Sequence, residues 1–198
     1  MSASVILTKV PLSSLPTRWR NADDIHRGVM SLFDRDLPGD QNERRATSNI
    51  LFRIESGSNG EGHVLVQSDR QTTHPELTST SLDPLLASLE TGVQVAFRID
   101  INPVTVKSHS NVRKAVPDDL IAAWFVAQKM QAAFAATEVR DIQCDQIRLK
   151  NSNSYLRIAR IDGVATVGDA DALREHIRHG VGRAKAYGCG LLSVAILR

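Results

Sequence analysis

The chain has 198 residues, 42% of them hydrophobic, and its 24 basic and 22 acidic residues leave a net charge of +2. Enough apolar side chains are present to form a core, which excludes a largely disordered chain. Because the two signs nearly cancel, the net charge by itself does not indicate a nucleic-acid-binding protein. The length allows one large domain or two small ones.

The sequence also argues against secretion, membrane insertion and zinc binding. The apolar run at residues 5–10 has no basic region before it, as a signal peptide would, and no stretch approaches transmembrane length. Cys144 and Cys189 form no C-x-x-C motif, and we expect both to be buried thiols. These features predict a cytoplasmic protein that uses no metal, no membrane and no small-molecule cofactor.

The first half of the chain predicts the order strand, helix, strand, strand, helix, strand. The first helix is indicated by Ile25, Val29 and Leu32, which repeat at i, i+4 and i+7. This order is typical of a ferredoxin-like unit. The expected elements are a strand at 5–10, a helix at 21–33, strands at 50–55 and 63–68, a helix at 81–90 and a strand at 93–101.

The second half predicts the same order of elements. Its last helix has Asp169 or Asp171 as a cap and Gly180 as a stop. The fold class expected is therefore α+β, with two tandem ferredoxin-like βαββαβ domains at residues 1–104 and 105–198. The expected elements are a strand starting at 104–108, a helix at 120–136, strands at 139–150 and 155–167, a helix at 169–180 and a strand at 191–197.

A glycine-rich loop, GVGRAKAYGCGLLSV, occupies residues 180–194 and carries Arg183 and Lys185. Glycine lets the backbone expose N–H groups to a close ligand, which favours phosphate binding. A P-loop or a Rossmann loop would need a helix after the glycines, and here a strand follows. The loop therefore does not indicate a mononucleotide site, and it stays compatible with a longer polyanion lying across it.

Basic residues concentrate in the C-terminal third, where residues 140–198 carry a charge of +4. A solvated charged face is the ordinary explanation for each of them. Their occurrence beside the glycine loop, in a fold whose sheets often bind RNA, favours RNA binding. The aromatic signature of RNA-binding sheets is missing, so we expect readout of phosphates and shape. The candidate residues are Lys107, Arg113, Lys114, Arg148, Lys150 and Arg157.

The six histidines give no pair with metal-ligand spacing and a carboxylate or cysteine partner. His26 lies at the edge of the apolar face of the first helix. The sequence pattern favours a histidine that only flanks this apolar face. The alternative is a general acid or base that faces a groove, because histidine titrates near neutral pH.

The segment GVGRAKAYGCGLLSVA resembles the C-terminal signature of the CasE (Cse-type) family, the CRISPR RNA-processing endoribonucleases of type I-E systems. Three further segments resemble the family in the same order: NADDIHRGVMSLF its histidine helix, ILFRIE with HVLVQS its hairpin, and FRIDINP its Arg-x-x-x-Asn-Pro strand. The resemblance spans nearly the whole chain.

This resemblance implies metal-independent cleavage of CRISPR repeat RNA at the 3′ base of its stem-loop. It also implies that the processed RNA stays bound and that the protein joins other subunits of the Cascade complex. The family's catalytic histidine falls on His26, with Arg27 beside it, and the family's lysine falls on Lys185. The residues expected to contact RNA on this basis are Arg98, Gly182, Arg183 and Lys185.

One departure from the family pattern leaves alternatives open. Members often carry tyrosine three residues before the histidine, where this chain has Asp23. An aspartate there could favour protonated His26 or repel the substrate phosphate, so its role is undetermined. A non-catalytic subunit that binds an RNA hairpin is one alternative function, and a small-molecule enzyme on the same scaffold is another.

Overall fold

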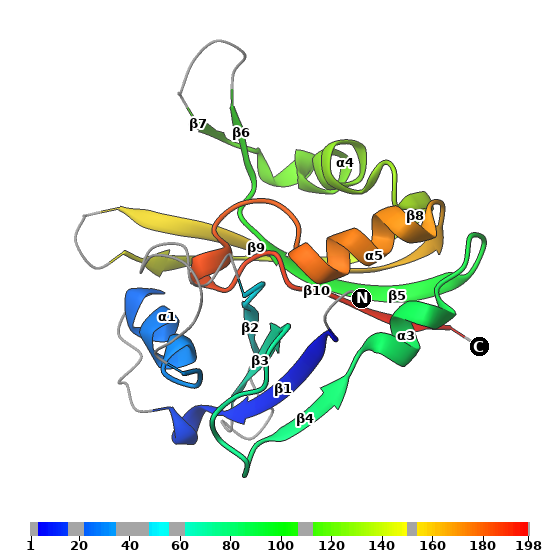
Figure 1. Cartoon of the computed structure of the whole chain (residues 1–198). Coiled ribbons are helices and arrows are strands. Elements are labelled where there is room, and N and C mark those ends of the chain that lie inside the picture. Colours follow the sequence, from blue (N-terminus) through cyan, green and yellow to red (C-terminus); the bar gives the residue numbers. More distant parts are fainter. Residues whose placement is uncertain are drawn as a thin grey trace.

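The computed structural model describes residues 4–15, 22–34, 48–55, 62–106, 113–149 and 154–197. These residues form two four-stranded sheets and a small two-stranded ribbon (Figure 1). The first sheet has the strand order β2-β3-β1-β4 and the second has the order β10-β5-β9-β8, with every neighbouring pair antiparallel. None of the described helices is long and apolar enough to cross a membrane.

The first sheet is built around β1, which pairs with β3 and β4. Its core contains Ile25 and Val29 from helix α1, packed with Val10, Phe52 and Val64 from the strands. The predicted apolar face of this helix is therefore confirmed. The bounds are β1 Ile6–Pro11, α1 Ala22–Met30, β2 Leu51–Glu55, β3 His63–Ser68 and β4 Thr78–Ser81, with a short 3-10 turn at Leu12–Ser14.

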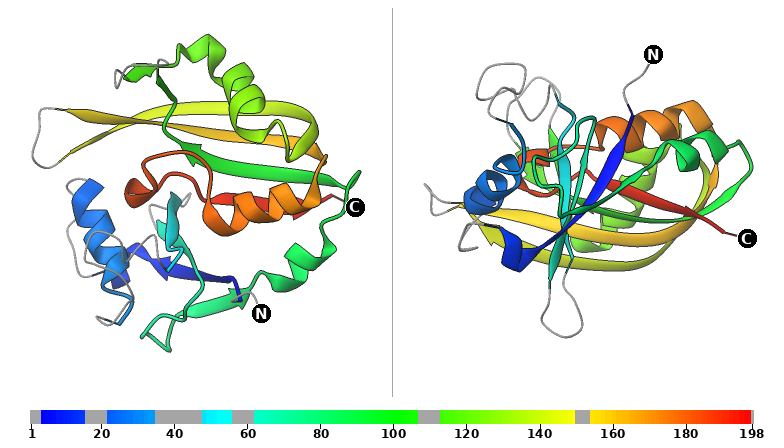
Figure 2. Two further views of the ribbon diagram at one scale, coloured as in Figure 1. Left: turned by 45° about the horizontal axis from the view of Figure 1, so that its top comes forward. Right: turned by 60° about the horizontal axis from the view of Figure 1, so that its bottom comes forward.

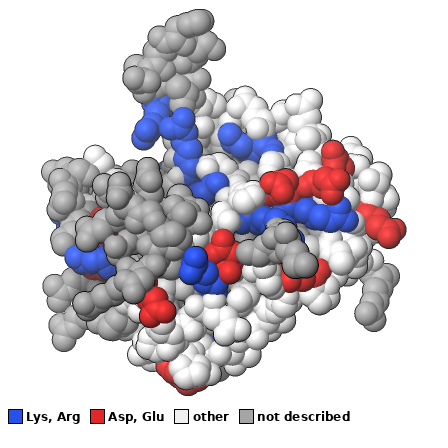
Figure 3. All heavy atoms as spheres, in the orientation of Figure 1, with Lys and Arg blue, Asp and Glu red and all other residues white. Residues whose placement is uncertain are grey.

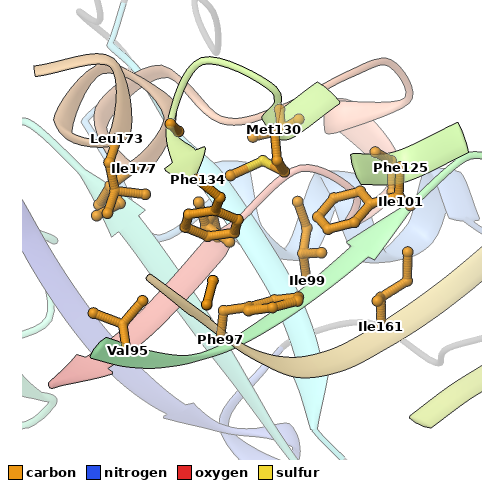
Figure 4. Close-up of a cluster of buried hydrophobic side chains, with 14 of the residues drawn as sticks. Val95, Phe97, Ile99, Ile101, Phe125, Met130, Phe134, Ile161, Leu173 and Ile177 are labelled. Carbon is orange, nitrogen blue, oxygen red and sulfur yellow. The ribbon is translucent and has the colours of Figure 1, made fainter. Parts of the chain in front are cut away.

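The second sheet carries helices α4 and α5 on one face. Phe97 of β5 lies at the centre of its core, with ring centroids 5.8 Å from Phe125 and 5.4 Å from Phe134 (Figure 4). Leu173 and Ile177 of α5 complete this core. The bounds are β5 Gln94–Ile101, α4 Ile121–Phe125, a π-helical turn Val126–Met130, β8 Phe134–Arg148, β9 Tyr155–Val167, α5 Ala170–His179 and β10 Leu192–Ile196.

The ends of α5 follow the local sequence signals. Asp169 is its N-cap and accepts hydrogen bonds from the backbone N–H groups of Asp171 and Ala172, at 2.9 and 3.0 Å. Gly180 ends the helix with a φ of 72°. The predicted cap and stop are thus confirmed, and they direct the chain into the glycine loop.

One strand belongs to a different sheet from the one expected. The strand expected at 93–101 belongs to the first unit in the predicted order, but β5 pairs with β9 and β10 of the second sheet. Helix α3 (Asp83–Ser88) connects the sheets, and the first sheet ends with β4, whose four residues are all exposed and polar. Such a strand has no apolar alternation to detect. The change of sheet falls between β4 and β5, so the boundary expected at 104/105 does not coincide with it.

Three further expectations are corrected. The helix expected at 120–136 begins as the 3-10 turn Asp118–Leu120, ends at Met130 and gives way to β8, because Phe134 is needed in the core of the sheet. The strand β6 (Val104–Val106) pairs with β7 (Arg113–Ala115) in the separate ribbon. Cys189 is buried, which raises the pKa of its thiol, but Cys144 is exposed on β8.

A buried arginine joins the two sheets. Arg53 of β2 is 2% exposed, and its Nη1 donates to the carbonyl oxygens of Arg98 at 3.1 Å and Leu191 at 3.0 Å. Its Nε donates to Glu55 Oε1 at 2.7 Å, and Glu55 also pairs with Arg98 and Arg160. Burial by itself would raise the pKa of Glu55, but the three arginines lower it on balance. Charge and hydrogen bonds therefore fix one sheet against the other.

Candidate nucleic-acid interface

A groove of about 610 Å³ lies between the glycine loop, β7 and the ends of β8 and β9. We call it the basic groove. It brings together four of the predicted RNA-binding residues, although Arg113 is far in sequence from the glycine loop. The lining residues are Asn102, Arg113, Leu149, Leu156, Gly182, Arg183, Ala184, Lys185 and Tyr187.

Lysine and arginine side chains gather over β7 on this face of the molecule (Figure 3). Arg113 and Arg183 are both exposed. Acidic residues are absent from the described residues that line the groove. This distribution of charge favours a polyanionic ligand.

The glycine loop owes its shape to close packing. A Cβ atom on Gly190, which has a φ of 90°, would lie 2.8 Å from the carbonyl oxygen of Val181. These two residues close the loop through a hydrogen bond of 2.9 Å from the Val181 N–H to the Gly190 carbonyl. The Gly190 N–H donates in turn to the Asp100 carbonyl on β5 at 2.7 Å. The glycines thus fold the loop tightly onto the second sheet.

Lys185 is held at the edge of the basic groove. It begins the 3-10 turn η4 (Lys185–Tyr187), and its Nζ donates to the carbonyl oxygen of His179 at 2.6 Å. That carbonyl is at the C-terminal end of α5, where cations are favoured by the helix dipole. The ammonium group therefore has a defined position beside the groove.

The helix that carries His26 packs against η4. Figure 2 shows α1 beside the loop that follows α5. His26 is half-buried, and Arg27 next to it is exposed and paired with Asp24. The fold therefore brings the helix that carries the candidate histidine against the turn that begins at Lys185.

Two predicted RNA-binding residues are engaged in contacts within the protein. Arg98 pairs with Asp162 through Nε at 2.6 Å and Nη2 at 3.0 Å, and this hydrogen bonding raises the pKa of the guanidinium. Arg157 donates to the Val116 carbonyl at 2.7 Å and pairs with Asp118. Through these contacts, both residues stabilise the region around the second sheet.

The other predicted residues are separated from the groove lining. Lys114 on β7 and Arg148 at the end of β8 are exposed and lie outside the lining given above. Lys107 and Lys150 lie outside the described residues. Tyr187 lines the groove and was not predicted; its signal in the sequence was that it is the aromatic residue within the glycine loop.

Two antiparallel sheets with a basic groove beside a histidine helix define an α+β protein suited to bind RNA. The family model described as "CRISPR associated protein" matches residues 7–195, and the chain belongs to this family. The family inferred from the sequence motifs is thereby confirmed.

Known proteins similar to this chain cover almost all of it. The Cascade subunit CasE of Escherichia coli (strain K12) is 27% identical over 193 residues, and the match covers 90% of this chain and 94% of that protein. A chain of a CRISPR RNA-guided surveillance complex, pre-nicking, is 27% identical with a TM-score of 0.65, covering 98% of this chain and 100% of that one. Thermus thermophilus Cse3 bound to an RNA representing a pre-cleavage complex has a TM-score of 0.76 at 21% identity, covering 97% and 99%, and this likeness shows the fold alone.

Proposed function

We propose that this protein is an endoribonuclease that binds CRISPR repeat RNA in the basic groove and cleaves it at the 3′ base of the stem-loop. The processed RNA then stays bound while the protein acts as a Cascade subunit. The similarity to the Cascade subunit CasE and to a chain of a surveillance complex supports the role as a Cascade subunit. The observation that carries the proposal is the packing of α1, with His26, against the turn that begins at Lys185.

We also interpret both sheets as ferredoxin-like. The order β10-β5-β9-β8, with helices after β5 and after β9, fits a βαββαβ unit. The first sheet has the equivalent order β4-β1-β3-β2, but residues 69–77, all of them described, contain no helix between β3 and β4. In this interpretation the first unit is a ferredoxin-like unit without its second helix.

The proposed reaction needs no metal ion. The ribose 2′-oxygen attacks the adjacent phosphorus, the bond from phosphorus to the 5′-oxygen breaks, and the products are a 2′,3′-cyclic phosphate and a 5′-hydroxyl. His26 accepts the proton of the 2′-hydroxyl or donates a proton to the leaving 5′-oxygen. Arg27 and Lys185 stabilise the negative charge that builds up on the phosphorane. The bound RNA supplies the in-line alignment.

Binding of the stem is assigned to the basic residues around the groove. Arg113, Arg183 and Gly182 contact the RNA backbone from the groove lining, because the described lining offers guanidinium donors and no carboxylate. The exposed residues of β7 and of the β8–β9 hairpin extend this contact along the A-form stem. The remaining proposed contacts are Arg98, Lys107, Lys114, Arg148, Lys150 and Arg157.

The test is cleavage of the protein's own repeat RNA in excess EDTA by the native protein and by His26→Ala. We expect the native protein to produce cyclic phosphate ends, and the variant to cleave at least about 100-fold more slowly while binding the RNA normally. Inhibition of the native protein by EDTA would contradict the metal-independent mechanism.

A non-catalytic RNA-binding subunit is the second candidate, and the acidic start of α1 favours it. Asp23 and Asp24 lie in the first turn of the helix, close to the position that the scissile phosphate would occupy beside His26. Tight binding of the repeat RNA without cleavage, by both the native protein and His26→Ala, would establish this alternative. Cleavage restored by Asp23→Tyr would then identify Asp23 as the cause.

A further inference from the structure

A second hollow, of about 250 Å³, adjoins the basic groove at Tyr187, which lines both. We call it the sheet pocket. It lies on the face of the second sheet opposite α4 and α5, because its β5, β8 and β9 residues alternate with those of the core. The lining residues are Ile54, Asp100, Gln143, Asp145, Ile147, Ile158, Arg160, Tyr187 and Gly188.

The walls of the sheet pocket suit a flat, partly apolar ligand. Ile54, Ile147 and Ile158 supply apolar surface, and Tyr187 supplies an aromatic ring. The volume is about eight times the roughly 30 Å³ that one water occupies in the liquid, which is room enough for a single nucleobase. A nucleobase matches these walls because it is planar and its faces are apolar.

The guanidinium of Arg160 has a fixed orientation in this pocket. It donates to Asp100 through Nε at 2.7 Å and Nη2 at 2.8 Å, and Nη2 also donates to the Ile54 carbonyl at 2.5 Å. Asp100 is 8% exposed, so this pair is shielded from solvent. A fixed guanidinium plane and an aromatic ring are the two surfaces on which proteins stack unpaired RNA bases.

The polar rim indicates which edge of a base would be read. Asp145 and Gln143 are exposed on β8, and the Gln143 amide is oriented by a 2.7 Å hydrogen bond that it donates to Asp141. A carboxylate can only accept hydrogen bonds, so it favours a base that carries an amino group. Guanine, adenine and cytosine have one, whereas uracil offers only its N3–H, flanked by two carbonyl oxygens that the carboxylate would repel. The same carboxylates would repel a phosphate, so the backbone belongs in the basic groove.

We propose that the sheet pocket binds one unpaired base of the RNA, next to the stem, stacked between Tyr187 and Arg160 and read by Asp145. This inference rests on the proposed function and adds a specificity site to it. The RNA backbone follows the basic groove, and Tyr187 is the point at which a base leaves the strand and enters the pocket. The protein then reads a base as well as phosphates.

The experiment measures binding of repeat RNAs in which each unpaired nucleotide beside the stem is made abasic in turn. We expect one abasic position to weaken binding by the native protein about tenfold, the scale of one base stacked on an aromatic ring. Tyr187→Leu should weaken binding of intact RNA by the same factor. It should weaken binding of that abasic RNA no further, because the base that would contact the ring is already absent. Tyr187→Phe keeps the ring and should bind like the native protein.

The preference among bases is tested at the same position. Asp145→Ala should bind RNA with uracil there as well as RNA with an amino-bearing base, while the native protein discriminates several-fold. Glu138→Gln is the matched control, because Glu138 is exposed on the same strand and lies outside both hollows. It should leave the discrimination unchanged.

Two results would overturn the proposal. The first is equal binding of every abasic RNA by the native protein. The second is that the losses of binding free energy caused by Tyr187→Leu and by the abasic position simply add when the two changes are combined. Cleavage of intact RNA in EDTA separates this failure from failure of the proposed function. A protein that cleaves intact RNA but ignores abasic positions lacks the base site alone. A protein that neither binds nor cleaves the repeat lacks both.

Discussion

The first sheet has strands of four to six residues, whereas the second contains β8 with 15 residues and β9 with 13. In the described residues, α1 packs on the first sheet, while α4 and α5 pack on the second around the larger core. The second sheet carries the glycine loop and most of the basic groove, and the first carries His26. The candidate site is therefore composite, and its geometry depends on how the sheets are joined.

Breaking the junction should have the largest effect. Arg53→Met leaves two strand carbonyls buried without their donor and removes one of the three arginine partners of Glu55, and we expect the free energy of unfolding to fall by about 3–5 kcal/mol. Denaturant unfolding measures this change. Arg140→Met, at an exposed ion pair, is the control and should cost less than about 1 kcal/mol. Equal stability of the two variants would show that the sheets are not held together by Arg53.

The glycine loop can be tested apart from the junction with two glycines of similar φ. At Gly92 φ is 88° and no atom lies within 4 Å of the added methyl, so Gly92→Ala should lower the free energy of unfolding by about 1–2 kcal/mol. Gly190→Ala, where φ is 90°, adds contact with the Val181 carbonyl and should cost about 1–3 kcal/mol more. Thermal unfolding compares them. A larger loss at Gly92 would contradict the close packing described for the loop.

The contribution of the second sheet to RNA binding is tested at Arg183, which is exposed in the groove lining. Arg183→Ala should weaken binding of repeat RNA and reduce the slope of log affinity against log salt by about 1. Arg140→Ala, outside the described lining, should change neither. An unchanged salt slope for Arg183→Ala would remove this residue from the interface.

The smallest effect concerns pH. Burial lowers the pKa of His176 on α5, the helix of the second sheet that leads into the glycine loop. His176 is therefore protonated more readily in the unfolded chain than in the folded one. As a result, the free energy of unfolding falls as the pH drops below about 6.5, the ordinary pKa of histidine. His176→Gln should flatten this decline between about pH 7 and pH 5. An identical pH dependence of unfolding would contradict the prediction.

Much of the fold was predictable because its signals are local. The spacing of Ile25 and Val29 predicted the buried face of α1, and Asp169 and Gly180 predicted both ends of α5. The strands of both hairpins also lie near the positions that their apolar patterns predicted, except that β8 begins at Phe134, within the segment expected to be helical. The collinear motifs indicated the family, and through it the choice of His26, which the pattern around that residue did not favour.

By itself, then, the sequence determined the local elements, the family and the charged loop, because periodicity, capping and motif residues act over a few neighbouring positions. Only the tertiary structure decided that β5 joins the second sheet, that Arg98 pairs with Asp162, and that Tyr187 lies between two hollows. Each of these depends on partners distant in sequence. An alternating strand predicts which face is buried but not which strand it pairs with, and a basic residue does not reveal which carboxylate the fold places beside it.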